Sequence, residues 1–232
     1  MWKISIQFNS QNIGVMQNII TCLNKATFKE FAYYVIKDKL FIEAGNDIAR
    51  IKSYVTKTIS KEIVTFYKKQ FVLNNIVVLG KFSEVLPHLI VLFELAQDIA
   101  FFESRIDLKN RFVIDSFIRF KCGILLSKWT NLVYLVSSNK QYLSNSAVAI
   151  DFFSFLLDNI SSNCNVAIRC EKDIFEIVGK DIQKHIDNES DLIMELLMLA
   201  PSKIDIYCTD KLNNSLISTL YQLFNKKINL LA

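Results

Sequence analysis

The stretch SDLIMELLMLAPSKIDIY, residues 190–207, decides the fold class, because it joins a helix directly to a strand. Asp187 or Asn188 can cap a helix over 191–199, since a short polar side chain satisfies the free N–H groups of a first turn. Pro201 cannot continue that helix and ends it. The chain after Pro201 alternates apolar and polar residues, which predicts a strand.

The elements around this junction predict a small mixed sheet at the C-terminus. We expect a strand over 203–208, a helix over 212–224 and a strand over 227–231. Strand, helix and strand in so few residues form a βαβ unit, which implies parallel strands and a right-handed crossover. The β-rich runs 165–170 and 174–178 predict a hairpin just before it.

The N-terminus predicts a second α/β piece. Residues 3–8 alternate apolar and polar residues, which indicates a half-buried strand. Asn9 or Ser10 can cap a helix that ends at about Leu23. Two short β-rich runs, 31–36 and 40–43, are separated by the turn residues Lys37-Asp38-Lys39. This piece therefore has the order β-α-β-β.

The middle of the chain has helical periodicity and no strong strand signal. The expected helices cover 47–71, 83–103, 109–136 and 147–160. We therefore predict an α+β fold with a helical middle, flanked by the N-terminal β-α-β-β piece and a C-terminal β-hairpin plus α-β-α-β piece. The expected boundaries give pieces at 1–45, 46–160 and 161–232.

Composition excludes several classes of protein. The chain has 232 residues, of which 51% are hydrophobic and 22% charged, so it is a folding chain and not a disordered one. Its five glycines are isolated, so neither a P-loop nor a dinucleotide-binding fingerprint is present. Its five cysteines include no CxxC pair, and neither histidine lies near a cysteine pair, so no zinc motif occurs. The sequence identifies no catalytic, cofactor-binding or metal-binding residue, and we expect no cofactor.

Two pairs of carboxylates have the spacing of one helix face. They are Glu94 with Asp98 and Asp187 with Asp191. Di-metal carboxylate bundles use such positions together with a Glu-x-x-His motif, which this chain lacks. We therefore interpret both pairs as solvated helix faces or helix N-terminal charge.

The helix expected over 47–71 carries a cationic stripe. At 100° per residue, its four members fall within about 40° of one another; they are Arg50, Lys57, Lys61 and Lys68. Such a stripe can bind the phosphates of nucleic acid or of an anionic membrane surface. The alternative is a solvated face that keeps an apolar protein soluble.

A second basic segment interleaves cations with aromatic residues over 105–129. Aromatic stacking on nucleic-acid bases is one use of such interleaving. At helical spacing, however, aromatic residues more often belong to the core. We therefore expect Phe112, Phe117, Phe120 and Trp129 to be core residues.

Two segments carry a family resemblance. The first is DSFIRFK, residues 115–121, and the second is the stretch 190–207. Together they resemble the YtxC-like sporulation proteins of endospore-forming Firmicutes, in which a phenylalanine-rich stretch starts a long helix and an "LL…APxKI.I" junction lies near the C-terminus. The family stretch carries Arg-Leu-Lys where this chain has Lys121-Cys122-Gly123. The matching residues are Phe117, Arg119, Phe120, Lys121, Ala200, Pro201 and Lys203.

The resemblance implies a cytoplasmic protein associated with sporulation, with no catalytic residues to carry over. We expect no signal peptide, because the first residues contain no apolar core followed by a cleavage site, and no transmembrane segment, because no apolar stretch is long enough. We therefore expect a non-enzymatic binding protein with a protein partner. The alternatives are a nucleic-acid or anionic-membrane binder that uses the cationic stripe, and an enzyme whose site is assembled from residues distant in sequence. The sequence indicates no oligomeric state.

Overall fold

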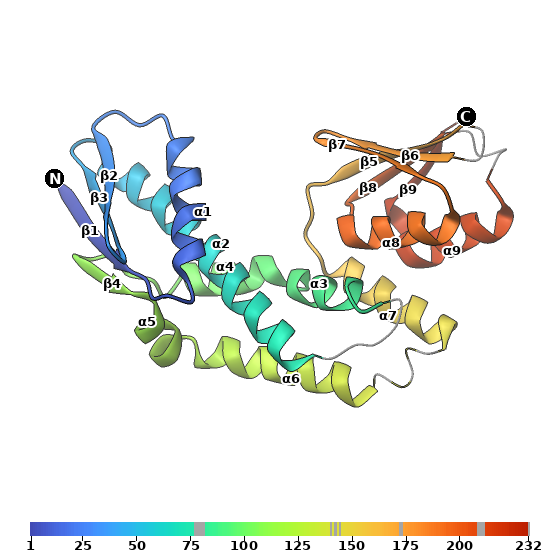
Figure 1. Cartoon of the computed structure of the whole chain (residues 1–232), viewed down its shortest axis with the longest axis horizontal. Helices are drawn as coiled ribbons and strands as arrows, with labels where there is room; N and C mark the ends of the chain where they lie inside the picture. The colour runs from blue at the N-terminus through green and yellow to red at the C-terminus, as the bar shows by residue number, and fades with distance from the viewer. Residues whose placement is uncertain are drawn as a thin grey trace. The chain divides into compact units, whose positions relative to one another are not determined.

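The computed structural model describes residues 1–76, 82–139, 141, 143, 145–171, 174–207 and 212–231 (Figure 1). Within that part of the chain, helices combine with two mixed sheets. The predicted α+β fold class, with α/β pieces at both ends and helices between them, is confirmed.

The chain forms two compact units, each of which is assembled from two segments. The N-terminal unit contains Met1–Asn74 and Leu95–Leu132, and the C-terminal unit contains Asn75–Glu94 and Val133–Ala232. These units do not follow the boundaries expected near residues 45 and 160, because the helical middle is divided between them.

One mixed sheet organises the N-terminal unit. Its strands lie in the order β2-β3-β1-β4. β3 pairs antiparallel with both β1 and β2, whereas β4 pairs parallel with β1. The predicted β-α-β-β order is confirmed. The bounds are β1 Trp2–Gln7, α1 Ile13–Asn24, β2 Phe31–Ile36, β3 Lys39–Ala44 and β4 Arg111–Val113.

Strand alternation determines which face of this sheet is covered. In β1, Ile4 is buried, whereas Lys3 and Ser5 lie on the opposite face. Figure 1 shows α1 and α2 (Ile48–Asn75) against one face of the sheet. Ile51 of α2 belongs to the same buried apolar cluster as Ile4. The other face carries the polar residues of β1.

The long helix α2 corresponds to the helix predicted over 47–71, and it ends at Asn75. Its apolar face recurs every three or four residues, as the sequence periodicity predicted. The buried positions are Ile51, Val55, Ile59, Ser60, Ile63, Val64, Lys68 and Val72. One of them is a lysine, which has consequences for the cationic stripe.

The single helix predicted over 83–103 is wrong. The structure has α3 (Val85–Leu92) and α4 (Leu95–Glu103), because Glu94 adopts a left-handed φ of 51° and interrupts the helical hydrogen bonding. Among the described residues, no single helix is long and apolar enough to cross a membrane. The bent pair of α3 and α4 has the necessary length and hydropathy only when the two helices are counted together.

The single helix predicted over 109–136 is also wrong. This region contains β4, then α5 (Ile114–Lys121) and α6 (Gly123–Asn139), with the helical path interrupted at Cys122. β4 was missed because it has only three residues, too few for alternation to be visible. It is a strand because Phe112 pairs with Ile6, far away along the chain.

The C-terminal unit contains a second mixed sheet, in the order β7-β6-β5-β8-β9. β8 and β9 are parallel and joined through α9, so the predicted βαβ unit is confirmed. β7 was not predicted. The bounds are α7 Ser146–Asp158, β5 Asn165–Glu171, β6 Ile174–Gly179, β7 Ile182–Ile186, α8 Glu189–Leu199, β8 Lys203–Tyr207, α9 Asn214–Phe224 and β9 Ile228–Leu231.

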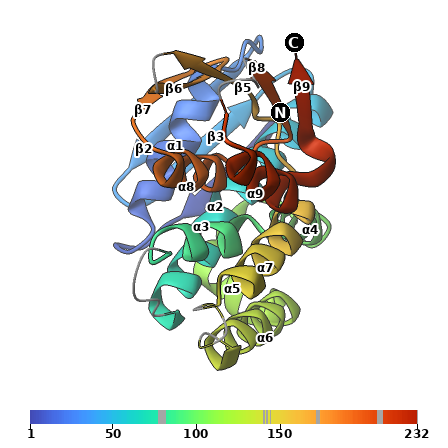
Figure 2. The same cartoon turned by 90° about the vertical axis from the view of Figure 1, so that its right-hand side faces the viewer.

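The C-terminal unit is layered. Figures 1 and 2 show α8 and α9 beneath one face of the sheet, with α3 and α7 on the far side of these two helices. Asn188 caps α8 through a hydrogen bond from the N–H of Asp191 to its side chain, as predicted. Ala200 ends the helix in the left-handed conformation with φ 43°, and Pro201 follows it.

The β2–β3 hairpin turns on two residues. Ile36 pairs directly with Lys39, so Lys37 and Asp38 form the turn, whereas Lys39, expected in the turn, is the first residue of β3. Lys37 has a φ of 55°, in the left-handed region that favours glycine. Two-residue hairpin turns commonly place glycine at this first position.

Replacing Lys37 with glycine is therefore expected to stabilise the protein. The left-handed conformation costs an L-residue about 1–2 kcal/mol, and glycine avoids this cost. Glycine, however, loses more backbone entropy on folding, which costs about 0.5–1 kcal/mol. We expect Lys37→Gly to raise the free energy of unfolding in urea by about 0.5–1 kcal/mol. Lys39→Gly, inside strand β3, should lower it. A Lys37→Gly variant less stable than the unchanged protein would contradict this account.

Candidate functional site

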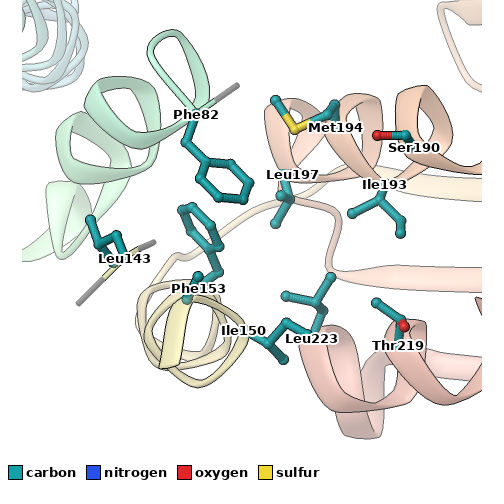
Figure 3. Close-up of a pocket in the computed structure, with 11 residues that line it drawn as sticks. Phe82, Leu143, Ile150, Phe153, Ser190, Ile193, Met194, Leu197, Thr219 and Leu223 are labelled. Atoms are coloured by element: carbon teal, nitrogen blue, oxygen red, sulfur yellow. The ribbon is translucent and has the colours of Figure 1, made fainter. Parts of the chain in front are cut away.

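An apolar pocket lies inside the C-terminal unit, between α7, α8 and α9 (Figure 3). Its volume is about 170 Å³. Its described lining carries no charged side chain and consists of Phe82, Leu143, Ala149, Ile150, Phe153, Ser190, Ile193, Met194, Leu197, Thr219 and Leu223. The sequence analysis missed it because these residues, read along their own helices, look like ordinary core positions.

Two aromatic rings form one wall of the pocket. Phe82 and Phe153 meet edge to face, with their ring centroids 4.9 Å apart. Figure 3 shows Met194 and Leu197 of α8 and Leu223 of α9 on the side facing these rings. The surface offered here is apolar and of about the size that accommodates one benzene ring.

The hydroxyl groups lie at the other end of the pocket. Figure 3 places Ser190 and Thr219 away from the rings. The Thr219 hydroxyl donates a hydrogen bond to the backbone carbonyl of Ser215, at 3.0 Å. Because the described lining contains no titratable side chain, the pocket can hold an apolar group but offers no general acid or base.

The structure shortens the cationic stripe. Arg50, Lys57 and Lys61 are exposed on α2, as predicted. Lys68, however, is only 1% exposed, so its assignment to a phosphate-binding stripe is wrong. Helical periodicity predicted the angle of Lys68 around the helix axis correctly. Lys68 is nevertheless buried, because α4 and α6 lie over this end of α2. The exposed stripe spans about 17 Å, from Arg50 to Lys61.

Lys68 belongs to a buried charge cluster. Its Nζ donates to Asp98 Oδ2 at 2.8 Å, and the indole Nε1 of Trp129 donates to the same oxygen at 3.0 Å. Lys128 Nζ donates to Asp98 Oδ1 at 2.6 Å. Asp98 is 1% exposed as a residue, so the interpretation of the Glu94–Asp98 pair as a solvated helix face is wrong. Asp98 does lie in the first turn of α4, in agreement with the other interpretation, helix N-terminal charge.

A second polar cluster fixes the start of α5. The Tyr67 hydroxyl donates to Asp115 Oδ1, and Asn9 Nδ2 donates to Asp115 Oδ2 at 2.7 Å. The buried Asn12 donates to the Tyr67 oxygen at 3.0 Å. Burial and the hydrogen bond to Asp115 raise the pKa of Tyr67 above its ordinary value. This cluster joins α2, α5 and the loop before α1, and Tyr67 stays protonated at neutral pH.

Of the four matching residues in the first family-like segment, one is packed against other rings and three are exposed. The Phe117 ring lies 4.8 Å from the Phe102 ring and 5.1 Å from the Phe112 ring. Arg119, Phe120 and Lys121 are exposed, so the expectation that Phe120 is a core residue is wrong. The expectation holds for Phe112 and Trp129, which are buried.

The second family-like segment lies in the other unit. Ala200 and Pro201 are buried at the end of α8, and Lys203 forms an ion pair with Asp205 at 2.9 Å. The structure therefore does not bring the two segments together in one unit. Their residues are explained within each unit as helix ends, core contacts and surface charge.

In the part of the chain that the structure describes, the other reactive side chains do not assemble into a site. His185 is exposed on β7. Burial raises the pKa of the Cys122 thiol to about 11, which keeps it protonated at neutral pH. Within the described residues, no three His, Cys, Asp or Glu side chains form a group that could hold a metal ion.

Comparison with known proteins finds no family model, no curated protein and no solved structure that matches this chain.

The buried charge cluster makes a testable prediction about stability. Removing one partner of a buried ion pair leaves an uncompensated charge, which typically costs about 3–5 kcal/mol. Asp98→Leu should lower the free energy of unfolding in urea by about 3–5 kcal/mol, because it removes the carboxylate from the buried Lys68. Lys68→Met should lower it by less, because Asp98 keeps its ion pair with Lys128 and the hydrogen bond from Trp129. The double variant should lose less than Asp98→Leu alone, because position 68 then holds no buried ammonium group that has lost the Asp98 carboxylate.

The exposed Lys61 provides the matched control on the same helix. Lys61→Met should change the free energy of unfolding by less than about 0.5 kcal/mol. If the two single-variant losses simply add in the double variant, Lys68 and Asp98 do not interact energetically.

Proposed function

We propose that this chain is a non-enzymatic, cytoplasmic binding protein of the sporulation programme, and that it holds an extended segment of a partner protein on strand β2. The free edge of this strand is the observation that carries the proposal. The resemblance to YtxC-like proteins supplies the link to sporulation.

Strand β2 ends the order of its sheet and pairs only with β3 among the described strands. Its outer edge therefore presents backbone N–H and C=O groups to a further strand. Proteins usually protect such edges with charged residues, proline or bulges. The sequence of β2, FAYYVI, contains neither proline nor a charged residue, so the edge is left open to pairing.

Apolar side chains accompany this free edge. Tyr34, Val35 and Ile36 are 45%, 41% and 54% exposed. The Tyr34 ring stacks on Phe41 of β3, with centroids 5.0 Å apart and an interplanar angle of 8°. Main-chain hydrogen bonds provide affinity when a peptide adds to a sheet edge, and side-chain contacts provide specificity. The edge of β2 offers both.

The proposal is tested by placing charge on the edge. We expect tagged protein from sporulating cells to retain a stoichiometric partner through nuclease treatment, and Tyr34→Lys/Ile36→Lys to reduce its recovery at least tenfold. Ile174→Lys is the matched control, because Ile174 is an exposed isoleucine on β6, an inner strand of the other sheet. It should retain the partner.

Two outcomes would contradict this function. One is equal partner recovery with the edge variant. The other is a wild-type chain that pairs only with itself, seen as a dimer by light scattering that the edge variant converts to a monomer. A deletion strain that sporulates normally under several conditions would remove the sporulation role.

A second candidate function is nucleic-acid binding through the shortened stripe. Arg50, Lys57 and Lys61 remain exposed on one face of α2, and no acidic residue lies on α2 between Arg50 and Lys61. Three cations in line along a helix can contact successive phosphates of a backbone.

Salt dependence tests this second function. If all three cations contact duplex DNA, the logarithm of the binding constant should fall against the logarithm of salt concentration with a slope of about −2.7. Lys57→Gln/Lys61→Gln should bring the slope to about −0.9. Lys25→Gln/Lys29→Gln, at two exposed lysines that follow α1, should leave it unchanged. A flat salt response would exclude the stripe as a nucleic-acid site.

A further inference from the structure

The corner between α5 and α6 exposes two large apolar side chains. Phe120, in the last turn of α5, is 75% exposed, and Ile124, in the first turn of α6, is 63% exposed. They lie on either side of the break at Cys122. Gly123, between them, has open space around the position of a Cβ atom. Unless a binding partner covers them, these two apolar side chains are in contact with water.

The two helices that carry these exposed side chains are fixed by their buried faces. Ile114 and Ile118 bury the opposite face of α5, and Cys122 and Leu125 continue the buried line into α6. The start of α5 is held by the hydrogen bonds of Asp115. The helices are therefore fixed while Phe120 and Ile124 point away from the core.

After Asp115, in the first turn of α5, the next charges along the chain are positive. Arg119 and Lys121 are exposed on either side of Phe120 in the chain. The exposed Arg105 lies close enough to Cys122 to affect its pKa. The sequence contains no acidic residue between Asp115 and Asp151, so nothing along this stretch of chain offsets the cations.

We propose that this corner binds the surface of an anionic lipid bilayer, with Phe120 and Ile124 inserted among the acyl chains and Arg119 and Lys121 on the lipid phosphates. Aromatic and aliphatic side chains next to cations are the combination that binds such interfaces. The positive charge complements anionic headgroups. A lipid interface also accommodates projecting side chains, whereas an extended peptide adds to a sheet edge, which the helices α5 and α6 do not offer. This site is separate from the β2 edge and from the stripe on α2.

Vesicle binding by the full-length chain tests the proposal. We expect at least tenfold stronger flotation with vesicles of phosphatidylglycerol and phosphatidylcholine in a 3:7 ratio than with pure phosphatidylcholine. Phe120→Ser/Ile124→Ser should weaken binding to the anionic vesicles at least tenfold. Arg119→Gln/Lys121→Gln should weaken it similarly at low salt, with a smaller difference at high salt.

A fluorescent reporter distinguishes insertion from simple adsorption. The emission of Phe120→Trp, after subtraction of the spectrum of the unchanged protein, should shift to the blue on anionic vesicles. Lipids with brominated acyl chains should quench it. A tryptophan that remains in water would show neither change, and the insertion of Phe120 would then be excluded.

Two matched controls separate this corner from other surfaces. Leu73→Ser removes an exposed apolar side chain from α2, and Lys57→Gln/Lys61→Gln removes two cations of the stripe. Both should bind the vesicles as the unchanged protein does, and thermal melting should show that every variant is folded. Loss of binding in the stripe variant alone would overturn the proposal. So would an absence of binding to both kinds of vesicle, or retention of the chain on heparin without binding to vesicles.

Discussion

The carboxylate of Asp98 is the contact on which the N-terminal unit depends. It accepts hydrogen bonds from Lys68, Lys128 and the indole of Trp129, and so ties α4 to α2 and to α6. These helices come from the two separate segments of the unit. A buried ion pair often adds little net stability, because both charges lose their hydration. It does penalise any arrangement that leaves one charge alone, and here it specifies how the second segment packs against the first.

The same constraint organises the surfaces for which we propose binding roles. Burial of Lys68 restricts the cationic face of α2 to its first half and leaves Arg50, Lys57 and Lys61 in solvent. Anchoring of Trp129 fixes α6, so the corner with α5 is a defined surface. The β2 edge lies on the same sheet whose inner face packs on α2. One core therefore supports three exposed surfaces of different chemistry. They are the apolar edge of β2, the cationic stripe on α2, and the corner between α5 and α6, which combines apolar and cationic side chains. Binding at any of them would require no reacting group.

Elements with a strong local pattern could be predicted, and elements set by distant partners could not. The alternation of residues 3–8 and the periodicity of α2 reflect burial of one face. This burial is visible in the order of neighbouring residues. The strand β4 exists because Phe112 pairs with Ile6, and the break between α3 and α4 depends on the left-handed Glu94. Lys68 lies at the same angle around the axis of α2 as the exposed Arg50, Lys57 and Lys61. It is buried only because α4 and α6 cover that end of the helix. The apolar pocket escaped prediction for the same reason, since its residues come from several helices.

The two-segment construction of the N-terminal unit has a consequence for synthesis on the ribosome. When residue 74 has been made, Lys68 is present without its partner, since Asp98 and Trp129 are translated later. The first segment cannot complete its core until about residue 132 has left the exit tunnel, and the start of the other unit emerges in between. Early closure within the first segment would bury a lone ammonium group, which is costly. Nascent chains shorter than this should therefore stay open and accessible to chaperones, and the unit should form late and in one step.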